Sequence, residues 1–382
     1  MKFLHVADLH IGKIVNDFSM LEDQKFILKQ ITEIAFSEHV EGVLIAGDIY
    51  DRAIPPAEAV AVFDRFVTEL SENGVRVFIV SGNHDSPERI SFGEEIFDKA
   101  GVHIAGTLKE ELKVIKIPQD YGELQVVLLP FVKPAQADVK TTQEAVEKLL
   151  SGYWEQEEKA ADKVRRILVT HYFVTDAGKE PELSDSETTV HVGGLDNVDA
   201  SLFQGFDYVA LGHIHKPQKI GAHQVWYGGS PLKYSFGESG QVKRVLLFDI
   251  DEAGTGKVEE AELSPLREMR KITGSLAELM ENTEYRDAYR EDYIQAVLTD
   301  KGELIDPIGT LRSAYPNIMQ IVRQEALQNS ETAGMETAGR RRMAEKKDTF
   351  SLFTSFYREV RGEELGEEGK QVIRELIKEL EE

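Results

Sequence analysis

Five short segments of the chain carry the side chains best suited to holding metal ions. Each contains Asp or His and follows an apolar run of the kind that forms a buried strand. A single Asp-x-His or His-x-His fragment is more often ordinary surface chemistry. Five of them at strand ends, where α/β folds place their sites, predict one shared centre. The segments are Asp8-Leu9-His10, Gly47-Asp48-Ile49-Tyr50-Asp51, Gly82-Asn83-His84-Asp85, His171 and Gly212-His213-Ile214-His215.

The expected donor set consists of carboxylates, imidazoles and one carboxamide, in a chain without cysteine. These ligands suit Mn²⁺, Fe²⁺, Mg²⁺ or Zn²⁺ and exclude metals that require thiolate. Two such ions about 3.5–4 Å apart can hold a hydroxide between them and clamp the oxygens of a phosphodiester during in-line attack. Asp48 is the expected bridging ligand, because a carboxylate can serve both ions. Asn83 would add a neutral carbonyl oxygen.

The elements expected to position these residues alternate between strands and helices from residue 1 to about residue 265. The early alternation predicts parallel βαβ units, and the denser, Gly-separated later strands predict a mixed or second sheet. Helical periodicity covers residues 20–39, 57–73 and 141–151. Strands are expected at residues 3–7, 42–46, 75–80, 124–129, 167–170, 208–211 and 245–250.

The remainder of the chain divides into three parts. Residues 266–327 have a smaller βαβαβ pattern, residues 328–349 lack apolar periodicity and are an expected linker, and residues 350–382 carry two amphipathic stripes typical of helices. Because this helical tail follows a long linker, we favour docking on another surface over packing against its own domain. In the βαβαβ part, strands are expected at 268–273, 293–299 and 318–323, with helices near 275–289 and 307–315.

The composition is that of an acidic globular protein. The chain has 382 residues, of which 41% are hydrophobic, and a formal net charge of −24 at pH 7. The lack of cysteine excludes disulfides, thiolate nucleophiles and iron–sulfur clusters. No apolar run approaches a membrane span or a signal peptide, so we expect a soluble, cytoplasmic protein. Taken alone, the acidity argues against nucleic acid and favours a small-molecule enzyme or a protein-binding module.

The five segments, written D-x-H, G-D-x-x-D, G-N-H-D, a lone H and G-H-x-H, resemble the motifs of the calcineurin-like metallophosphoesterases over roughly residues 1–250. The resemblance implies a four-layer α/β/β/α sandwich, here with a small α/β cap domain and the helical tail. It makes His84 the catalytic histidine, which contacts the scissile phosphate and assists the leaving oxygen. One metal would be held by Asp8, His10, Asp48 and His215, and the other by Asp48, Asn83, His171 and His213.

Two longer runs, residues 192–218 and 227–238, resemble the nuclease subunits of bacterial SbcC–SbcD complexes. The resemblance implies a Mn²⁺-dependent DNA nuclease of repair and recombination, with exonuclease activity on double-stranded ends and endonuclease activity on hairpins and single strands. Its organisation would be a nuclease domain (1–265), a DNA-facing cap (266–327), a linker (328–349) and a region that binds the SbcC coiled coil (350–382). It also implies a homodimer within a heterotetramer. Helices 57–73 and 92–100 are candidates for the dimer contact only because they lie beside the site motifs.

Other interpretations of the same sequence stay open. A phosphatase or a cyclic-nucleotide phosphodiesterase could use this core, whereas a non-catalytic scaffold would be expected to have lost ligands. The acidic surface predicts that stable binding of DNA needs the SbcC-type partner. Basic residues of the cap are candidate phosphate contacts, although a solvated face of mixed charge would look the same: Lys271, Arg286, Arg290, Lys301, Arg312 and Arg323.

Asp51 is the one departure from the archaeal and eukaryotic relatives, which the resemblance gives a second histidine at this position. We expect its carboxylate to orient His84 and raise the pKa of that imidazole. The alternative is a structural Asp that caps the loop. Among the remaining candidates, Asp85 is expected to accept backbone hydrogen bonds, His5 to be a core histidine, and His191 is a candidate substrate contact.

Overall fold

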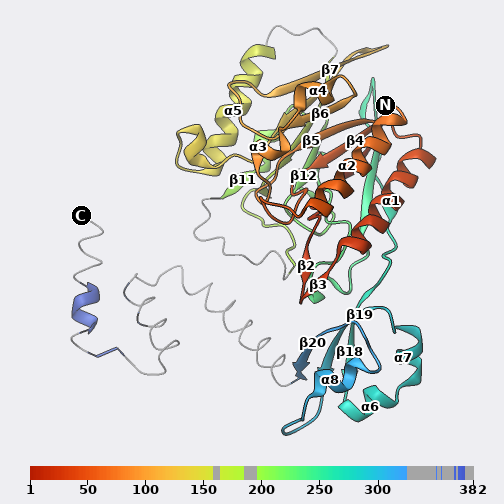
Figure 1. Ribbon diagram of the computed structural model, residues 1–382. Coiled ribbons are helices and arrows are strands. Elements are labelled where there is room, and N and C mark those ends of the chain that lie inside the picture. Colours follow the sequence, from red (N-terminus) through yellow and green to blue (C-terminus); the bar gives the residue numbers. More distant parts are fainter. Residues whose placement is uncertain are drawn as a thin grey trace.

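The computed structural model describes residues 1–157, 164–184, 196–324, 350, 354, 365–366 and 369–374 (Figure 1). His191, the predicted linker and most of the predicted helical tail lie outside this part of the chain. No helix in the described part is long and apolar enough to cross a membrane.

The first of two large sheets has the N-terminal strand, β1, at its centre. Strands β1, β4, β5 and β6 are parallel, and β15 pairs antiparallel with β1. Helices α1 (Leu21–Ser37) and α2 (Ala57–Glu72) pack on one face through side chains such as Ile27, Ile31 and Phe66. The strands are β1 (Lys2–Val6), β4 (Gly42–Ala46), β5 (Arg76–Val80), β6 (Val102–Ala105), β15 (Arg244–Asp251), β16 (Gly254–Thr255) and β17 (Glu259–Glu262).

The second sheet has the order β13-β14-β12-β9-β8-β7 and is also mixed. Its outer face is covered by α5 (Thr142–Glu157), which buries Val146, Leu150 and Tyr153 against the strands. Helix α5 ends six residues later than the periodicity predicts. The strands are β7 (Lys113–Gln119), β8 (Gly122–Leu129), β9 (Val164–His171), β12 (Tyr208–Gly212), β13 (Gln218–Ile220) and β14 (Val225–Tyr227).

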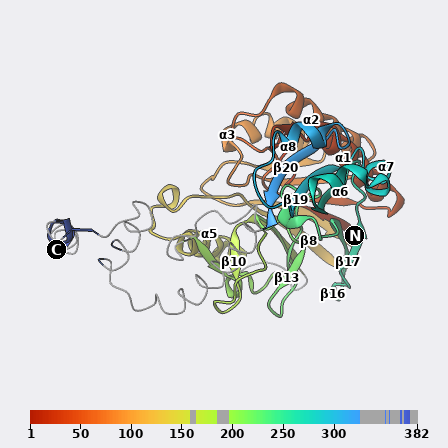
Figure 2. The same ribbon diagram turned by 90° about the horizontal axis from the view of Figure 1, so that it is seen from below.

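A dry apolar layer joins the two sheets face to face. Tyr208 stacks on Phe248 with ring centroids 3.7 Å apart, and Phe3 lies on the far side of Phe248 at 5.5 Å. Both views place α1 and α2 on one side of the sheets and α5 on the other (Figure 2). The helix, sheet, sheet, helix layering follows from strands that are apolar on both faces.

Shorter elements connect the strands of the two sheets. Near the metal-type motifs, the chain between β5 and β6 forms two short helices rather than one long one, and the segment after β14 forms a 3₁₀ turn. These elements are β2 (Ile14–Val15), β3 (Phe18–Ser19), α3 (Pro87–Ile90), α4 (Glu94–Asp98), η1 (Pro134–Ala137), β10 (Phe173–Thr175), β11 (Asn197–Asp199), η2 (Ala200–Phe203) and η3 (Phe236–Glu238).

A small α/β lobe with its own core follows the main body. Its three parallel strands lie within one residue of the predicted ones, and Tyr315 and Leu311 are fully buried in its centre. The lobe is tied to α1 by Asp23, whose carboxylate accepts from Arg267 and from the Tyr293 hydroxyl, both at 2.7 Å. Its elements are β18 (Met269–Gly274), α6 (Leu276–Glu281), α7 (Thr283–Ala288), β19 (Tyr293–Leu298), α8 (Pro307–Arg312) and β20 (Ile318–Arg323).

Candidate metal centre

The five motifs meet at one edge of the paired sheets. They follow β1, β4, β5, β9 and β12, whose carboxyl ends point to the same side because these strands are parallel within each sheet. Four of the motif residues adopt the left-handed backbone conformation, which is costly for residues other than glycine. They are Asp8 (φ 53°), His10 (φ 45°), Asp48 (φ 49°) and His213 (φ 102°). Backbone strain is therefore concentrated where the ligand side chains gather.

The loops approach each other so closely that two positions must be glycine. A Cβ atom on Gly212 would lie 1.9 Å from the carbonyl oxygen of Ala46, and one on Gly82 would lie 2.1 Å from Oδ1 of Asp48. Such distances leave no room for any side chain. The glycines flanking the motifs thus allow loops from both sheets to share one small volume.

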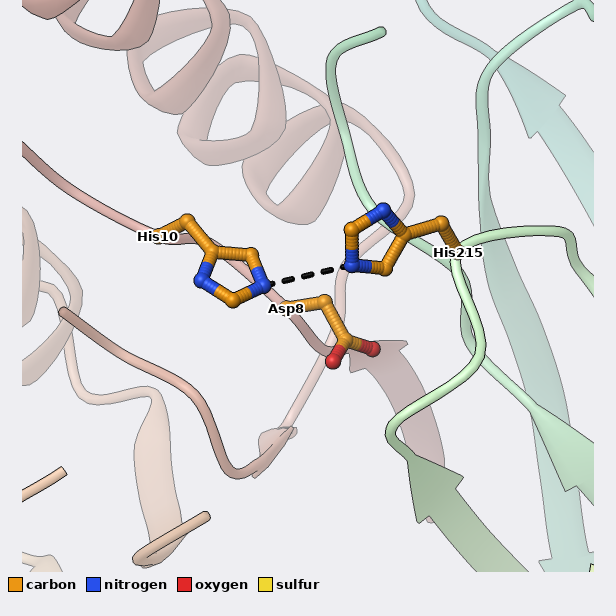
Figure 3. Close-up of side chains that lie close together, drawn as sticks. All are labelled: Asp8, His10 and His215. Atoms are coloured by element: carbon orange, nitrogen blue, oxygen red, sulfur yellow. Dashed lines mark hydrogen bonds between the residues drawn. The ribbon is translucent and has the colours of Figure 1, made fainter. Parts of the chain in front are cut away.

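The first group of ligands is formed by Asp8, His10 and His215 (Figure 3). All three side chains are buried, and one ligand atom from each lies within 4.8 Å of the others. Nε2 of His10 faces Nε2 of His215 at 3.2 Å. In the metal-free protein one of these nitrogens donates to the other, and a cation between them would accept both lone pairs.

Asp48 lies at the centre of the site. Its Oδ2 is 3.4 Å from Nε2 of His171, 3.8 Å from Nε2 of His10 and 3.9 Å from Nε2 of His84. Burial alone would raise the pKa of Asp48, but the facing imidazoles, above all His171, hold it below its usual range. The same pairing outweighs burial at His171 and raises the pKa of its imidazole to about 9. A charged carboxylate oxygen among three imidazole nitrogens suits a bridging ligand.

The second group surrounds Asn83. Its Oδ1 is 3.0 Å from Nε2 of His171 and 3.1 Å from Nδ1 of His213. Main-chain atoms orient this group: Nδ1 of His171 donates to the carbonyl oxygen of Ala46 at 2.8 Å, and the backbone N–H of His213 donates to both oxygens of Asp8 at 3.0 and 3.1 Å. The second ring nitrogen of His171, Nε2, and Nδ1 of His213 therefore face the same atom, Oδ1 of Asn83.

The donor set fits divalent cations. The described residues form three overlapping groups of candidate His and Asp ligands, and Asp8, His10 and Asp48 each belong to two of them. The carbonyl oxygen of Asn83 lies next to His171 in one of these groups. Nδ1 of His10 is buried without a hydrogen-bond partner in the described part of the chain. Burial raises the pKa of Asp8 to about 6, which a neighbouring cation would offset. Hard oxygen and imidazole donors that converge in this way can hold two ions and activate a phosphoester.

The comparisons with known proteins agree with this geometry. Residues 1–217 match the family model of the calcineurin-like phosphoesterases, and residues 265–361 match the model described as the type 5 capsule protein repressor C-terminal domain. The SbcD subunit of the SbcCD nuclease of Staphylococcus epidermidis is 30% identical over 385 residues, which cover 99% of this chain and 98% of that one. The chain belongs to the calcineurin-like phosphoesterases. Within them it belongs to the family of the SbcD nuclease subunits.

Solved structures of lower similarity were also matched. TT1561 of Thermus thermophilus has 15% identity and a TM-score of 0.40, and covers 68% of this chain and 98% of its own. A dimetal phosphatase from Danio rerio has 15% identity and a TM-score of 0.40, with 69% and 98% covered. The predicted α/β metallophosphoesterase fold is confirmed by the family match and by the two mixed sheets. The family match also confirms the prediction that the chain is a metal-dependent phosphoesterase.

His84 of this calcineurin-like phosphoesterase lies at the open side of the centre. Its side chain is 43% exposed, whereas those of His10 and His171 are buried. Its backbone N–H donates to Oδ1 of Asp48 at 2.9 Å, and its ring stands edge-on to His10. Of the two ring nitrogens, Nε2 faces Asp48 and Nδ1 faces residue 51.

The prediction that the Asp51 carboxylate contacts His84 is wrong. The two residues are in contact, but through other atoms. Nδ1 of His84 donates to the main-chain carbonyl oxygen of Asp51 at 3.1 Å. The carboxylate turns the other way and binds Nζ of Lys13 at 2.6 Å, with Nδ1 of His10 at 3.9 Å. The ammonium of Lys13 offers a stronger partner than a neutral imidazole. Any influence of Asp51 on His84 therefore runs through the backbone, and its role as a catalytic residue stays a prediction.

Asp85 accepts backbone hydrogen bonds, as predicted, and so joins two of the motif loops. Its carboxylate accepts from the backbone N–H groups of Ile49, Tyr50 and Gly82 at 2.9–3.1 Å. It thereby fixes the loop of Asp48 to the loop of Asn83 and His84. His5 is a core histidine, as predicted, with Nδ1 3.1 Å from the Tyr208 hydroxyl and Nε2 3.2 Å from the carbonyl oxygen of Leu211.

Sequence reasoning missed a supporting shell around His10 and His215. Gln24 donates to the carbonyl oxygen of His10 at 2.7 Å and to the Tyr234 hydroxyl at 3.1 Å. Tyr234 in turn donates to the carbonyl oxygen of Leu9, and its ring contacts both histidines. The signal that could have found it is the run 227–238, which carries the resemblance but contains no metal ligand.

Proposed function

We propose that this chain is a DNA nuclease that hydrolyses phosphodiesters with two divalent cations, for which Mn²⁺ is the expected metal, and acts with an SbcC-type ATPase in DNA repair and recombination. The observation that carries the proposal is the convergence of Asp, His and Asn ligands around Asp48, in a chain related over its whole length to a nuclease subunit. The expected activities are exonuclease on double-stranded ends and endonuclease on hairpins and single strands.

The ligands divide between two cation positions. Asp8, His10 and His215 would hold one ion, Asn83, His171 and His213 the other, and Asp48 would serve both. When bound, the cations supply Lewis-acid activation of water and stabilise charge on the phosphate oxygens. Five of the proposed ligands are buried, whereas Asn83 and His84 are exposed and His213 is half-buried, so the phosphate would approach from the side of these three residues.

His84 is placed to handle the proton of the leaving group. Its Nδ1 is held by the carbonyl oxygen of Asp51, a bond that both the neutral and the protonated imidazole keep. Nε2 therefore faces the centre and is the atom that holds or delivers a proton to the leaving oxygen. Its exposure lets a strand of DNA approach from that side.

Access to DNA is proposed to depend on the lobe and on the partner. The lobe carries the candidate phosphate contacts Lys271, Arg286, Arg290, Lys301, Arg312 and Arg323, but the chain as a whole has a net charge of −24. Phosphate contacts dominate affinity for DNA, so the isolated chain should bind DNA weakly and its SbcC-type partner should supply most of the affinity. A tight, metal-independent complex of this chain alone with DNA would refute this dependence.

The tail, residues 350–382, is proposed to bind the coiled coil of the SbcC-type ATPase through its amphipathic stripes. Deletion of these residues should abolish the complex with the ATPase while leaving metal-dependent hydrolysis of a simple phosphodiester unchanged. Co-purification measures the first and a chromogenic phosphodiester the second. Retained complex formation would contradict the assignment.

Homodimerisation is proposed to use the apolar face beside α2. A groove of about 690 Å³ between α2 and residues 89–104 is rimmed by exposed Val60 and Phe97, and Phe92 next to it is 79% exposed. A second copy can cover this face, because a two-fold axis sets the same patch against itself. Phe92→Glu should convert a dimer into a monomer in light scattering. A wild-type monomer or a dimeric variant would contradict the proposal.

The proposed activity is tested by incubating the purified chain with Mn²⁺ and DNA duplexes, hairpins, a cyclic nucleotide or a phosphomonoester. The proposal predicts cleavage of DNA, and loss of that cleavage in His84→Gln with both cations still bound. Hydrolysis of only the phosphomonoester or the cyclic nucleotide would instead indicate a phosphatase or a cyclic-nucleotide phosphodiesterase on this core.

A further inference from the structure

A buried ion pair lies directly behind one of the predicted metal ligands. Glu238 in η3 is fully buried, and one of its oxygens is 2.6 Å from Nζ of Lys243, which is itself almost fully buried. Neither residue is a predicted ligand or catalytic group. A charged pair removed from water in this way is costly, and a hydrophobic pair of the same size would often be at least as stable. Its position therefore needs an explanation other than stability.

The pair contacts His215 on both its side chain and its backbone. Oε1 of Glu238 lies 3.6 Å from Nδ1 of His215, and Nζ of Lys243 donates to the carbonyl oxygen of His215 at 3.1 Å. The opposite ring nitrogen of His215, Nε2, points at His10 (Figure 3). The imidazole is thus held between the buried carboxylate and the predicted cation position.

The other contacts of the pair fix it in place. Lys243 also donates to the Ser230 hydroxyl at 2.9 Å and to the side chain of Gln241 at 3.1 Å, and the Ser235 hydroxyl donates to Oε1 of Glu238 at 3.2 Å. Oε2 of Glu238 is bound by the ammonium of Lys243 at 2.6 Å, and Oε1 is bound by the Ser235 hydroxyl. The two carboxylate oxygens therefore point in set directions.

We propose that Glu238 is a positioning residue that keeps the proton of His215 on Nδ1 and so presents the Nε2 lone pair to a cation, with Lys243 fixing the carboxylate and the His215 backbone. A carboxylate behind a ligating imidazole sets its tautomer and its orientation. The unpartnered Nδ1 of His10 fits this arrangement, because His10 then carries its proton on Nε2 and donates it to Nε2 of His215.

The inference rests on the proposed function in that it takes His215 as a ligand, but it can be tested without any assay of activity. Two variants remove the carboxylate: Glu238→Gln alone, and Glu238→Gln with Lys243→Met, which leaves no unpaired buried charge if the single variant fails to fold. The matched control is Asp207→Asn. Asp207 is an ion-paired Asp at the opposite end of β12, bonded to Arg165 at 2.9 Å and to the backbone N–H of Arg166 at 2.8 Å.

Titration calorimetry of the metal-free proteins with Mn²⁺ should show two binding events in the wild type. In both Glu238 variants one event should weaken by about 10- to 100-fold, while the other event and the control stay unchanged. Long-range ¹H–¹⁵N NMR of the metal-free proteins should show His215 protonated on Nδ1 in the wild type and in the control, and should show this form lost in the variants.

Unchanged Mn²⁺ affinity in the folded double variant would overturn the inference. So would weakening without a change of tautomer, or equal weakening in Asp207→Asn, because either result would indicate a general loosening of the structure. DNA cleavage by the wild type distinguishes this failure from failure of the proposed function. If the wild type cleaves DNA while the variants bind metal normally, only the inference fails. If the wild type binds two Mn²⁺ as described but leaves DNA intact, only the proposed nuclease function fails.

Discussion

The two halves of the candidate metal centre are built by different means. In the half around His171, the candidate ligands are held through main-chain atoms: the carbonyl oxygen of Ala46 binds His171, the backbone N–H of His213 binds Asp8, and Asp85 binds the backbone of the loops of Asp48 and Asn83. In the half around His215, side chains do this, with Gln24 and Tyr234 behind His10 and Glu238 behind His215. The first arrangement depends on close packing of loops, and the second on the identity of a few residues.

The two kinds of support predict which substitutions should disrupt each half. Main-chain support is insensitive to most substitutions, but it fails when a loop is pushed away. Side-chain support fails one residue at a time. Asp48 belongs to neither half alone, since its Oδ2 faces His10, His84 and His171.

Removal of the shared ligand should have the largest effect. Asp48→Asn should bind neither cation tightly and should lower the rate of DNA cleavage by at least about 10³-fold, because stabilisation of charge on the phosphate is lost. Metal content after dialysis and a cleavage assay measure the two effects. Asp249→Asn, at an exposed position of β15, is the control. Retention of both cations by Asp48→Asn would rule out a bridging role.

The next largest effect is expected from pushing apart the loops of the half around His171. In Gly212→Ala the new Cβ would lie 1.9 Å from the carbonyl oxygen of Ala46 and 2.6 Å from Nδ1 of His171. We expect a loss of about 1–3 kcal/mol in the free energy of unfolding, and weaker binding of the cation in this half. Gly152→Ala is the matched control, since its Cβ would meet no atom within 4 Å. Equal behaviour of the two variants would show that the loops can separate without consequence.

A smaller effect is expected when one supporting side chain of the half around His215 is shortened. Tyr234→Phe removes a buried hydroxyl that bonds with Gln24 and Leu9. We expect a loss of about 1 kcal/mol in the free energy of unfolding, with one Mn²⁺ binding event weakened and the other unchanged. Chemical denaturation and calorimetry measure these changes. Equal weakening of both events would contradict the division into two halves.

The smallest effect is predicted for Asp51→Asn. The residue meets His84 through its main-chain oxygen, so the substitution should leave the imidazole in place and the pH–rate profile unchanged. The substitution weakens the ion pairs of Asp51 with Lys13 at 2.6 Å and with Arg52 at 3.6 Å, and each partly exposed pair is worth roughly 0–1 kcal/mol. A clear shift of the pH–rate profile would show that the carboxylate acts on His84 after all.

Much of the fold and the gathering of the candidate ligands could be predicted from the sequence, because both depend on local patterns. Strand ends followed by Asp8, Asp48 or His171 are visible without a structure, and the strands of the lobe fall within one residue of their predicted positions. What could not be predicted depends on atoms brought together from distant segments. From the sequence, the carboxylate of Asp51 was the expected partner of His84. In the fold the main-chain carbonyl oxygen of Asp51 contacts His84 instead, because the carboxylate binds Lys13.

The supporting shell was hidden for the same reason. Glu238 and Lys243 meet His215 only because the chain returns to the site after β14, and Gln24 reaches His10 from α1. None of these residues has the spacing of a metal motif. Their polar side chains also look like ordinary surface residues until their burial is known.

Anomalous diffraction from crystals of the protein grown with Mn²⁺ would show whether one bridging carboxylate joins two cations. We expect two peaks, one among Asp8, His10, Asp48 and His215 and one among Asp48, Asn83, His171 and His213. A single peak, or two peaks that do not share Asp48, would contradict this expectation.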